Sequence, residues 1–392
     1  MRYRLTSDEL LILRDGRPFG EFGVYSGNSL SWPLPQTIAG MVRTSVGFSR
    51  NMDFFNNPSN AEKILEVGIS KILPMVKISA VWKPLLPPPA DLVLTRKEND
   101  YSTESENKLW VSQLSFKCIE DDSGTDISNR EWMIPSSDLR EKPVEEAPFF
   151  YHWDFYVKYI KGDLKKEIEC SFEDIGISQP ISDVRIHNAI DMSTYTTEEG
   201  KLFSNAGFYM KTKIAYELVD LGIDFSVTNA KSNMIPGEAY LGGERKRVVL
   251  TPTNNGFPAF PKYFTNKKFL KIVLITHGDF GGWCPNWLKP DLQSDSISWT
   301  TIPNTQFKIR LRSAVVRGWD SVSGWDYKTK KPKAMRKLVR PGSVYLIEID
   351  DKVQSSDIAN HLWGNSLNIE DASSKDGYGE CLVGNVNIKD IK

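Results

Sequence analysis

The sequence predicts an α+β protein with two domains and antiparallel sheets. Its 392 residues, 40% of them hydrophobic, exceed what one compact core usually holds, so two domains are expected. The clearest pattern lies in the last third, where apolar segments and one helical segment follow the order β-(α)-β-β-α-β. That order is typical of the ferredoxin-like, or RRM-like, arrangement, in which helices cover one face of a four-stranded antiparallel sheet.

Four segments of the last third carry the strand pattern, because they are short, apolar and rich in β-branched residues. They span residues 268–276, 306–316, 335–350 and 379–386. Ile358, His361 and Leu362 recur at steps of three and four, which predicts a helix over 356–363. Gly364 suits the position just past the end of that helix.

The first two thirds begin in a similar way but are heavily interrupted. Strands are predicted over residues 3–13, 76–82, 207–228 and 244–250. A helix is predicted over Pro35–Val46, since proline suits the first helical position and Gly47 suits the position beyond the end. The prolines between Pro84 and Pro89 predict irregular structure, and the polar, mixed residues 95–137 indicate an insertion.

The break Asn-Asn-Gly-Phe-Pro at 254–258 marks the expected domain boundary. The first domain then spans residues 1–257 and carries the long insertions, and the second spans 258–392. We therefore expect two ferredoxin-like (RRM-like) domains with insertions and antiparallel sheets.

Composition limits the classes of function. The formal net charge is −1, so a nucleic-acid-binding role must depend on a local basic patch. No run approaches the roughly 20 apolar residues of a membrane helix, and the first residues lack the apolar segment of a signal peptide, so we expect a cytoplasmic protein. Four widely separated cysteines predict neither a zinc site nor a disulfide framework, and no cofactor is expected.

The motif Arg-Asp-Gly-Arg-Pro-Phe at 14–19 contains a tight-turn signal. Such a turn presents Arg14 and Arg17 at the end of a strand, where arginines hold phosphates bidentately. The alternative is an ordinary turn with a local Arg–Asp pair.

The polar face of the first predicted helix carries Gln36, Gly40 and Arg43, which fall at steps of four and three and so line one side. The small Gly40 lets another backbone approach, Arg43 adds a positive charge, and the helix N-terminus favours a phosphate. The alternative is that Gly40 only packs against a strand and has no role in binding.

The motif Leu-Gly-Gly-Glu-Arg-Lys-Arg at 241–247 places Gly242 and Gly243 next to Arg245 and Arg247. A flexible backbone followed by basic residues suits a phosphate backbone, although no Gly-Lys-Ser/Thr ends the motif as in a Walker loop. The alternative is a glycine turn that enters an edge strand.

The stretch 328–340 holds seven basic residues and no acidic one, among them Lys333, Arg336 and Arg340. Trp319, Trp325 and Tyr327 precede it. Basic groups interleaved with aromatic rings suit single-stranded RNA, whose bases stack and whose phosphates pair. The alternative is a solvated basic face.

A glycine-rich loop, with Gly377 and Gly379, leads into the last predicted strand. An apolar strand follows it instead of a helix, which excludes a Rossmann fingerprint. The loop either lets a nucleic-acid backbone lie close or is an ordinary turn.

His187, in Arg-Ile-His at 185–187, is a possible general base. The other histidines stand in unrelated contexts, and no paired-carboxylate or His-Asp metal motif is present. A structural or RNA-contacting histidine is therefore favoured over a catalytic one, and no catalytic or metal residue is assigned.

These motifs together resemble the third subunit of the Cmr module, the type III-B CRISPR effector complex, within the RAMP superfamily. The resemblance extends in order over nearly the whole chain. Besides the motifs above, it rests on residues 33–44 (PLPQTIAGMVRT), 87–92 (PPPADL), 185–191 (RIHNAID), 198–203 (EEGKLF), 318–320 (GWD) and 340–345 (RPGSVY).

The resemblance implies a protein without nuclease activity that binds the 5′ handle of the guide RNA. It implies contacts with the large polymerase-like subunit and with the backbone RAMP subunits, and a role in antiviral defence. One departure is that Glu380 and Cys381 follow the last glycine, where relatives often carry bulkier or basic residues. The alternative function is a RAMP endoribonuclease that processes guide RNA precursors.

Two further expectations concern surfaces. We predict that one cleft between the two domains brings together Arg14, Arg17, Arg43, Arg245 and the stretch 328–340. Trp283, Trp287 and Trp299 are close in sequence, and part of this apolar surface is predicted to face partner subunits.

Overall fold

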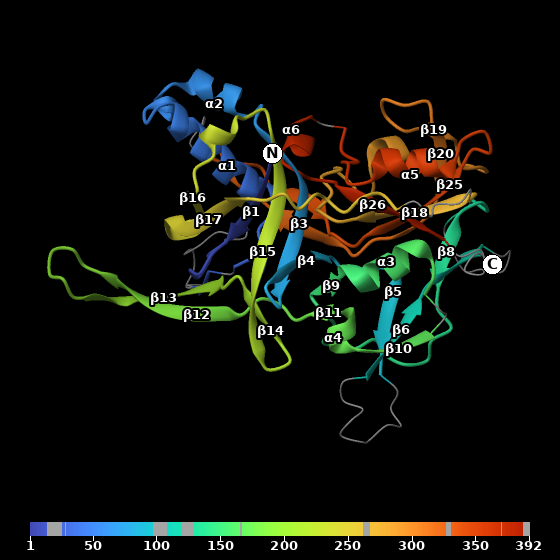
Figure 1. Cartoon of the computed structure of the whole chain (residues 1–392), viewed down its shortest axis with the longest axis horizontal. Coiled ribbons are helices and arrows are strands. Elements are labelled where there is room, and N and C mark those ends of the chain that lie inside the picture. Colours follow the sequence, from blue (N-terminus) through green and yellow to red (C-terminus); the bar gives the residue numbers. More distant parts are fainter. Residues whose placement is uncertain are drawn as a thin grey trace. The chain divides into compact units, whose positions relative to one another are not determined.

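The structure is a computed structural model. It describes residues 1–13, 26–27, 29–96, 108–119, 127, 129–164, 167–261, 267–326, 331–369 and 371–386. The fold is mixed α/β, with mostly antiparallel sheets and few helices (Figure 1).

Contacts divide the chain into two compact units that are not consecutive in sequence. Unit 1 consists of Met1–Trp82, Gln179–Asn255 and Ser321–Arg336. Unit 2 consists of Lys83–Ser178, Gly256–Asp320 and Lys337–Lys392. One crossing, between Asn255 and Gly256, lies two residues from the predicted boundary. The other crossings lie at the ends of two segments. Lys83–Ser178 belongs to unit 2, and Ser321–Arg336 belongs to unit 1.

The main sheet of unit 1 is antiparallel throughout. In spatial order its strands are β3 (Gly68–Ile78), β15 (Glu217–Thr228), β1 (Arg2–Thr6), β17 (Lys246–Pro252) and β16 (Glu238–Leu241). The strand β14 (Lys211–Ile214) pairs with β15. When the four strands β1, β3, β15 and β17 are numbered by their order in the chain, their spatial order is second (β3), third (β15), first (β1), fourth (β17).

Helix α1 (Pro35–Arg50) follows the predicted amphipathic pattern, with Ile38, Val42 and Val46 buried. It does not end at Gly47, as the sequence suggested, but continues to Arg50. A Cβ on Gly47 would lie 2.5 Å from the ring of Phe55, so this glycine allows close packing inside the helix and does not cap it. Short elements follow: η1 (Phe54–Asn56) and α2 (Pro58–Ile64).

Several predicted strands differ in their limits. The predicted strand 3–13 is shorter, since β1 ends at Thr6. Pro84 lies inside a strand, β4 (Val81–Leu86), although the sequence predicted irregular structure from there to Pro89. The strand predicted over 335–350 is two strands, because the turn at Pro341–Gly342 separates β24 (Arg336–Val339) from β25 (Val344–Ile349).

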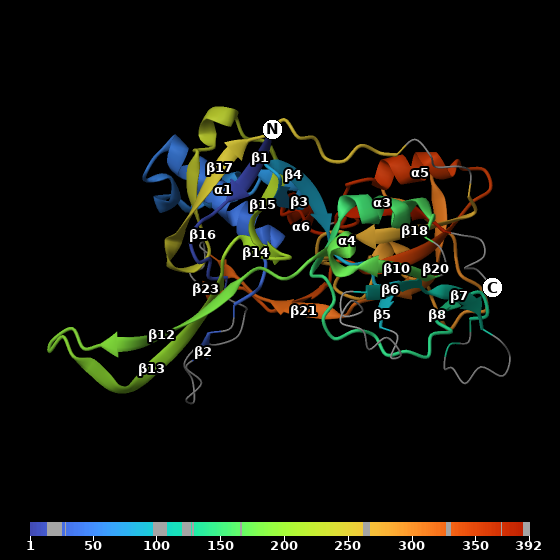
Figure 2. The same ribbon diagram turned by 60° about the horizontal axis from the view of Figure 1, so that its bottom comes forward.

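A long hairpin also belongs to unit 1. It consists of β12 (Ser182–Ile190) and β13 (Thr197–Phe208), and β2 (Ser26–Gly27) pairs with β13 in parallel. In Figure 2 the hairpin reaches out beyond the sheet of unit 1. Its exposed apolar side chains include Val184 and Ile186, which are 63% and 69% exposed.

The sheet of unit 2 is also antiparallel. In spatial order its strands are β19 (Thr300–Thr301), β20 (Lys308–Val315), β25, β18 (Phe269–Leu274) and β26 (Cys381–Asn385). When β18, β20, β25 and β26 are numbered by their order in the chain, their spatial order is again second (β20), third (β25), first (β18), fourth (β26). The segment between β18 and β20 contains a 3-10 turn, η4 (Asn286–Leu288), and α5 (Ser355–Leu362) lies between β25 and β26. Gly364, with φ +67°, follows α5 as predicted.

Both faces of this sheet are covered. On one face Ile347 packs in a core with Ile358 and Leu362 of α5. On the other face Leu346 packs with Phe116 and Met133 of the segment predicted as an insertion. This second face is therefore core and is not open in the way an RRM sheet is when it binds RNA.

The covering layer comes from residues 83–178. Its helices are α3 (Trp153–Lys161) and α4 (Phe172–Ile175), and its strands are β5 (Leu92–Thr95), β6 (Lys108–Gln113), β7 (Ser115–Cys118), β8 (Met133–Ser136), β9 (Phe150–His152), β10 (Glu167–Ser171) and β11 (Gly176–Ile177). A fully buried ion pair joins this layer to the sheet, since the Nζ of Lys271 on β18 lies 3.4 Å from Asp91. The hydroxyl of Tyr159 on α3 donates to the same carboxylate at 2.6 Å.

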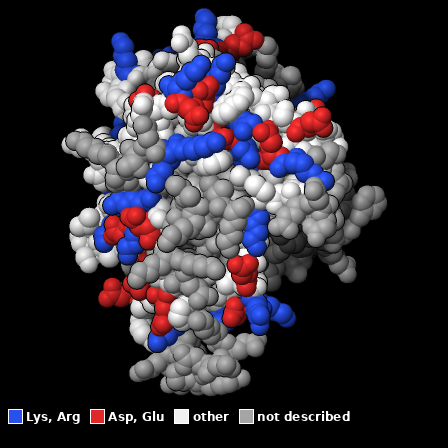
Figure 3. All heavy atoms as spheres, turned by 90° about the vertical axis from the view of Figure 1, so that its right-hand side faces the viewer, with Lys and Arg blue, Asp and Glu red and all other residues white. Residues whose placement is uncertain are grey.

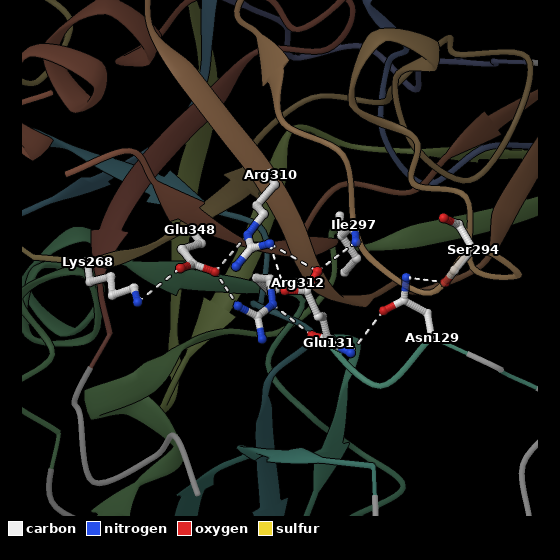
Figure 4. A network of polar contacts seen from close by, with 8 residues as sticks. All are labelled: Asn129, Glu131, Lys268, Ser294, Ile297, Arg310, Arg312 and Glu348. Atoms are coloured by element: carbon white, nitrogen blue, oxygen red, sulfur yellow. Dashed lines mark hydrogen bonds and ion pairs between the residues drawn. The ribbon is translucent and has the colours of Figure 1, made fainter. Parts of the chain in front are cut away.

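A polar network fixes the same layer to β20 and β25, two inner strands of the sheet (Figure 4). Glu348 on β25 accepts hydrogen bonds from Arg310, Arg312 and Lys268. Arg310 also donates to Glu131 of the covering layer at 2.9 Å. Burial alone would raise the pKa of Glu348, but the hydrogen bonds from these cations outweigh it and lower that pKa.

The remaining described elements are a ribbon, two 3-10 turns and a short helix. A ribbon consists of β21 (Trp319–Val322) paired with β24 and, beyond it, β22 (Trp325–Asp326) paired with β23 (Lys331–Pro332). Unit 1 contains the 3-10 turns η2 (Ser232–Met234) and η3 (Gly243–Arg245), and α6 (Asp371–Lys375) precedes the last strand. None of the described helices is long and apolar enough to cross a membrane.

Candidate nucleic-acid interface

Arg14 and Arg17 lie outside the described residues, but the chain that leads to them is placed. The N–H of Gly243 donates to the carbonyl of Ile12 at 2.8 Å, and the N–H of Leu30 donates to the carbonyl of Leu13 at 2.7 Å. Ile12, two residues before the Arg-Asp-Gly-Arg motif, therefore contacts the Leu-Gly-Gly-Glu-Arg motif. The predicted convergence of Arg14 and Arg17 with Arg245 stays a prediction.

Gly242 is required by this contact. Its φ is +75°, and a Cβ would lie 2.4 Å from the carbonyl oxygen of Ile12. Gly243 has more room, with its nearest neighbours at 3.5 Å. The neighbouring Glu244 accepts a hydrogen bond from Asn205 of β13, which ties the base of the long hairpin to the same loop.

The two arginines of this loop have partners within unit 1. The guanidinium of Arg245 lies 4.8 Å from the ring centroid of Tyr240. Arg247 forms an ion pair with Glu238 at 2.8 Å, and both side chains are more than half exposed. An exposed pair of this kind contributes little to stability and exchanges readily for another anion.

Gln36, at the start of α1, joins the helix to the basic ribbon. Its side-chain N–H donates to the carbonyl of Ser323 at 2.9 Å, and its oxygen accepts from Arg336 at 2.7 Å. Both partners lie about 300 residues away in sequence and belong to unit 1. The helix N-terminus and part of the stretch 328–340 are therefore neighbours within unit 1.

The other two residues of the predicted helix face behave differently. Gly40 is exposed, and no atom lies within 4 Å of an added Cβ, so it does not pack against a strand. Arg43 donates to the carbonyls of Val67 and Leu65, at 2.8 and 3.3 Å. This arginine fixes the helix to the segment before β3.

Lys331, Lys333 and Lys337 are exposed on the ribbon. The backbone N–H of Lys333 donates to Gly324, and its carbonyl accepts from the hydroxyl of Ser323, so the ribbon is a hydrogen-bonded structure and not a loose loop. Residues 327–330 lie outside the described part of the chain.

Arg340 belongs to a second cluster, in unit 2. Its guanidinium forms an ion pair with Asp320 at 2.7 Å, and His277 Nε2 lies 3.1 Å from the other oxygen of that carboxylate. Burial would raise the pKa of Asp320, but the hydrogen bonds from His277 and Arg340 lower it from 3.8 to about 2. Asp320 is therefore ionised at neutral pH and neutralised by its neighbours.

The glycine-rich loop lies against this cluster. Gly377 and Gly379 have φ values of +85° and +74°, and the N–H of Gly379 donates to the carbonyl of His277 at 2.7 Å. A Cβ on Gly379 would lie 2.1 Å from the side-chain oxygen of Asn368. The loop is thus packed and has a defined place beside His277. The sequence did not predict that His277 lies beside the glycine-rich loop. The available signal was Asp320 in the Gly-Trp-Asp motif, a possible partner for a histidine.

His187 lies on the long hairpin of unit 1. It stands on β12, where its ring stacks on Phe203 of β13, with ring centroids 5.3 Å apart. The nearby Arg185 is exposed and bonds Asp183 and the hydroxyl of Tyr209. None of these contacts brings a second histidine to His187.

The predicted use of part of the surface around three tryptophans as an interface stays a prediction. Trp283 and Trp287 pack against the core of unit 2, and the indole N–H of Trp287 donates to the carbonyl of Leu367. Trp299 is 43% exposed. The first two are partly buried against this core.

Charge and metal ligands are distributed as follows. On the face drawn in Figure 3, Lys and Arg side chains are interspersed with Asp and Glu side chains over the described residues, as on an ordinary solvated surface. In the parts of the chain that the structure describes, no group of three or more His, Cys, Asp or Glu side chains is placed to hold a metal ion.

Comparison with known proteins gives one family. Residues 3–386 match the family model described as CRISPR-associated protein (Cas_Cmr3). No curated protein sequence matches.

Three solved structures contain similar chains. One is the cryo-EM structure of the type III-B Cmr-beta complex bound to cognate target RNA and AMPPnP, with 16% identity, a TM-score of 0.47 and coverage of 96% of this chain and 95% of that one. A second is the same complex bound to cognate target RNA, with 17% identity, a TM-score of 0.43 and the same coverage. The third is a type III-A Csm3-Csm4 subcomplex, with 10% identity, a TM-score of 0.30 and coverage of 89% and 93%.

Proposed function

Because the chain belongs to the Cas_Cmr3 family of CRISPR-associated proteins, and so is a subunit of the Cmr module of type III-B CRISPR effectors, we propose that it binds the 5′ handle of the guide RNA without cutting it. It acts in antiviral defence as a scaffold, and cleavage belongs to neighbouring subunits. This role needs a surface that holds a single-stranded polyanion in a fixed place.

The observation that carries the proposal is the contact of Gln36 with Arg336 and Ser323. It joins two regions that the sequence marks separately as phosphate-binding, the start of α1 and the basic ribbon. The first turn of α1 holds no acidic residue, and Lys331 and Lys333 are exposed nearby on the ribbon. A phosphate at this place gains from the helix N-terminus and from the lysines together.

Each unit has a ferredoxin-like core. The support is the strand order, which is second, third, first, fourth in both sheets, with all neighbours antiparallel. Each core keeps one of its two helices, α1 in unit 1 and α5 in unit 2. Since residues 83–178 cover the second sheet face of unit 2, loops and strand ends carry the RNA contacts there.

The partners are the large polymerase-like subunit and the backbone RAMP subunits. The apolar side chains that support an interface are those of the β12–β13 hairpin. Replacing Val184 and Ile186 with Ser leaves folding unchanged and weakens co-purification with the co-expressed subunits. Leu218→Ser, at the exposed β14–β15 hairpin, is the control.

A second function, the metal-independent endoribonuclease, is favoured by one observation. His277, Asp320 and Arg340 are in contact, and a histidine held by a carboxylate is a general-base arrangement. Asp320 is also saturated by Arg340, which suits a structural cluster equally well.

The decisive experiment incubates the purified chain with CRISPR repeat RNA, with and without magnesium, and measures binding and cleavage in the same samples. We expect handle binding and intact RNA. Specific cleavage that disappears in His277→Ala or His187→Ala would establish the endoribonuclease and refute the binding role as the sole function.

A further inference from the structure

We propose that Trp319 stacks on a base of the bound guide RNA handle, and that Lys337 holds the phosphate beside that base. This inference rests on the proposed function and makes it more specific, because it names a position in the protein that contacts a base.

Trp319 is 57% exposed. A tryptophan in a monomer normally buries most of its ring, since exposing so large an apolar surface is unfavourable. Its place is nevertheless fixed, because it opens β21, which pairs with β24 in the ribbon. The preceding residue, Gly318, accepts a hydrogen bond from the N–H of Arg340 at 3.1 Å.

The charge around the ring favours an anion. The Nζ of Lys337 lies 5.1 Å from the centroid of the Trp319 ring. The carboxylate beside it, Asp320, is ion-paired with Arg340 and in contact with His277, so its charge is compensated. Lys331 and Lys333 are exposed farther along the same ribbon. An aromatic face with cations beside it is the arrangement that binds single-stranded nucleic acid, because bases stack on the ring while phosphates meet the cations.

A second exposed tryptophan in the same unit shows what sets Trp319 apart. Trp299 is 43% exposed and has the guanidinium of Arg310 at 4.8 Å from its ring centroid. Arg310, however, donates to both Glu348 and Glu131 (Figure 4). The cation beside Trp299 is therefore held by two carboxylates. Trp299 is also exposed and has a neighbouring cation, but the acidic groups around it disfavour a phosphate, so it is the matched control.

The test uses the full-length protein and synthetic single-stranded RNA carrying the 5′ end of the guide from the same CRISPR locus. A series of these RNAs has one handle nucleotide at a time replaced by an abasic residue. Inorganic polyphosphate of similar length serves as a polyanion without bases. Affinities are measured for the wild type and for Trp319→Ala, Trp319→Phe and Trp299→Ala.

We expect Trp319→Ala to weaken RNA binding by about 5- to 150-fold, the range for one stacked base. Trp319→Phe, which keeps a ring, retains most of the affinity, and Trp299→Ala binds as the wild type does. Polyphosphate binding is the same in all four proteins. At one abasic position the wild type loses the same factor, and there Trp319→Ala has no further effect.

The failures are distinguishable. If the wild type does not bind the handle RNA, the proposed function is wrong and this inference falls with it. If the wild type binds and Trp319→Ala binds equally well, the function stands and the stacking position is refuted. If Trp319→Ala binds RNA normally but no longer co-purifies with the other effector subunits, the ring belongs to a protein interface and the proposal is also refuted.

Discussion

At the scale of single residues, the predicted RNA-binding side chains fall into two groups. Some are engaged within the protein: Arg43 holds backbone carbonyls and Arg340 is paired with Asp320. Others are exposed on the ribbon. The sequence located the basic stretch because it holds seven cations in a neutral chain, but it did not separate these groups, since an ion pair with a distant carboxylate leaves no local signal.

The exposed lysines should carry the salt dependence of RNA binding. In Lys331→Ala/Lys333→Ala/Lys337→Ala, the slope of log affinity against log salt should flatten by up to about two units, because each lost phosphate contact removes about 0.7 from it. Binding isotherms with handle RNA at several salt concentrations measure this.

The control has the same change in net charge at exposed lysines outside the ribbon, Lys289→Ala/Lys308→Ala/Lys352→Ala in unit 2. An equal flattening in both triple variants would mean that net charge alone, and not the ribbon, determines the affinity. Arg336 and Arg340 are left intact because each has a partner whose loss would disturb the fold.

Asp320 should make stability pH-dependent in acid. Its pKa is depressed to about 2 in the folded chain, so its stabilising contribution is fully present above about pH 4 and is lost as the pH falls toward 2. The wild type should exceed Asp320→Asn in free energy of unfolding by at most about 2 kcal/mol at neutral pH, and the difference should shrink below pH 4. Urea unfolding from pH 7 to pH 3 tests this. Asp8→Asn, at a highly exposed side chain, should show no such convergence.

At the scale of elements, the sequence predicted those helices and strands whose apolar residues follow a strong local periodicity. The apolar stripe of α1, the helix α5 with its following glycine, and the strands of the last third all have one strong periodicity or a short apolar run. The failures came where distant packing overrides it. Gly47 looked like a helix end, but it is a contact with Phe55, and only the folded chain places that ring there.

The loop before β17 offers a test of such packing. Gly242→Ala should destabilise the protein by about 1–3 kcal/mol, because φ is +75° and the new Cβ would meet a backbone carbonyl. Gly243→Ala, one residue on, has ordinary contact distances and should change stability by less than about 0.5 kcal/mol. Thermal unfolding of the two variants compares them. Equal stability of the two would show that the close approach to Ile12 does not constrain this loop.

At the scale of the whole molecule, contacts divide the chain into two units that are not consecutive in sequence, whereas the sequence predicted a single boundary within 254–258. It did not predict that residues 83–178 belong with the second unit, because a segment rich in polar residues gives no sign of which sheet it will cover. Buried contacts such as Lys271 with Asp91, 180 residues apart, determine this. Pairing at that separation is a property of the folded chain alone.

The division should be visible in fragments. A chain of residues 1–257 lacks Ser321–Arg336 of unit 1 and contains the covering layer of unit 2 without its sheet, so Phe116 and Met133 lose their partner Leu346. We expect it to aggregate, and co-expression with 258–392 should return both pieces to the soluble fraction. Size-exclusion chromatography and unfolding curves decide the matter, and a monomeric 1–257 with a cooperative transition would refute the prediction.

The interleaved path of the chain also matters while the protein is being made. A ribosome adds about 5–20 residues per second, so roughly 4 to 16 s separate the emergence of residue 255 from that of residue 336. During that time the nascent first unit is incomplete, because Ser323 and Arg336, the hydrogen-bond partners of Gln36, have not yet both emerged. Neither unit can complete its fold before synthesis has reached the last third of the chain. The newborn polypeptide is therefore exposed to chaperones and proteases over most of its translation, and its yield in a cell depends on elongation speed between those two points.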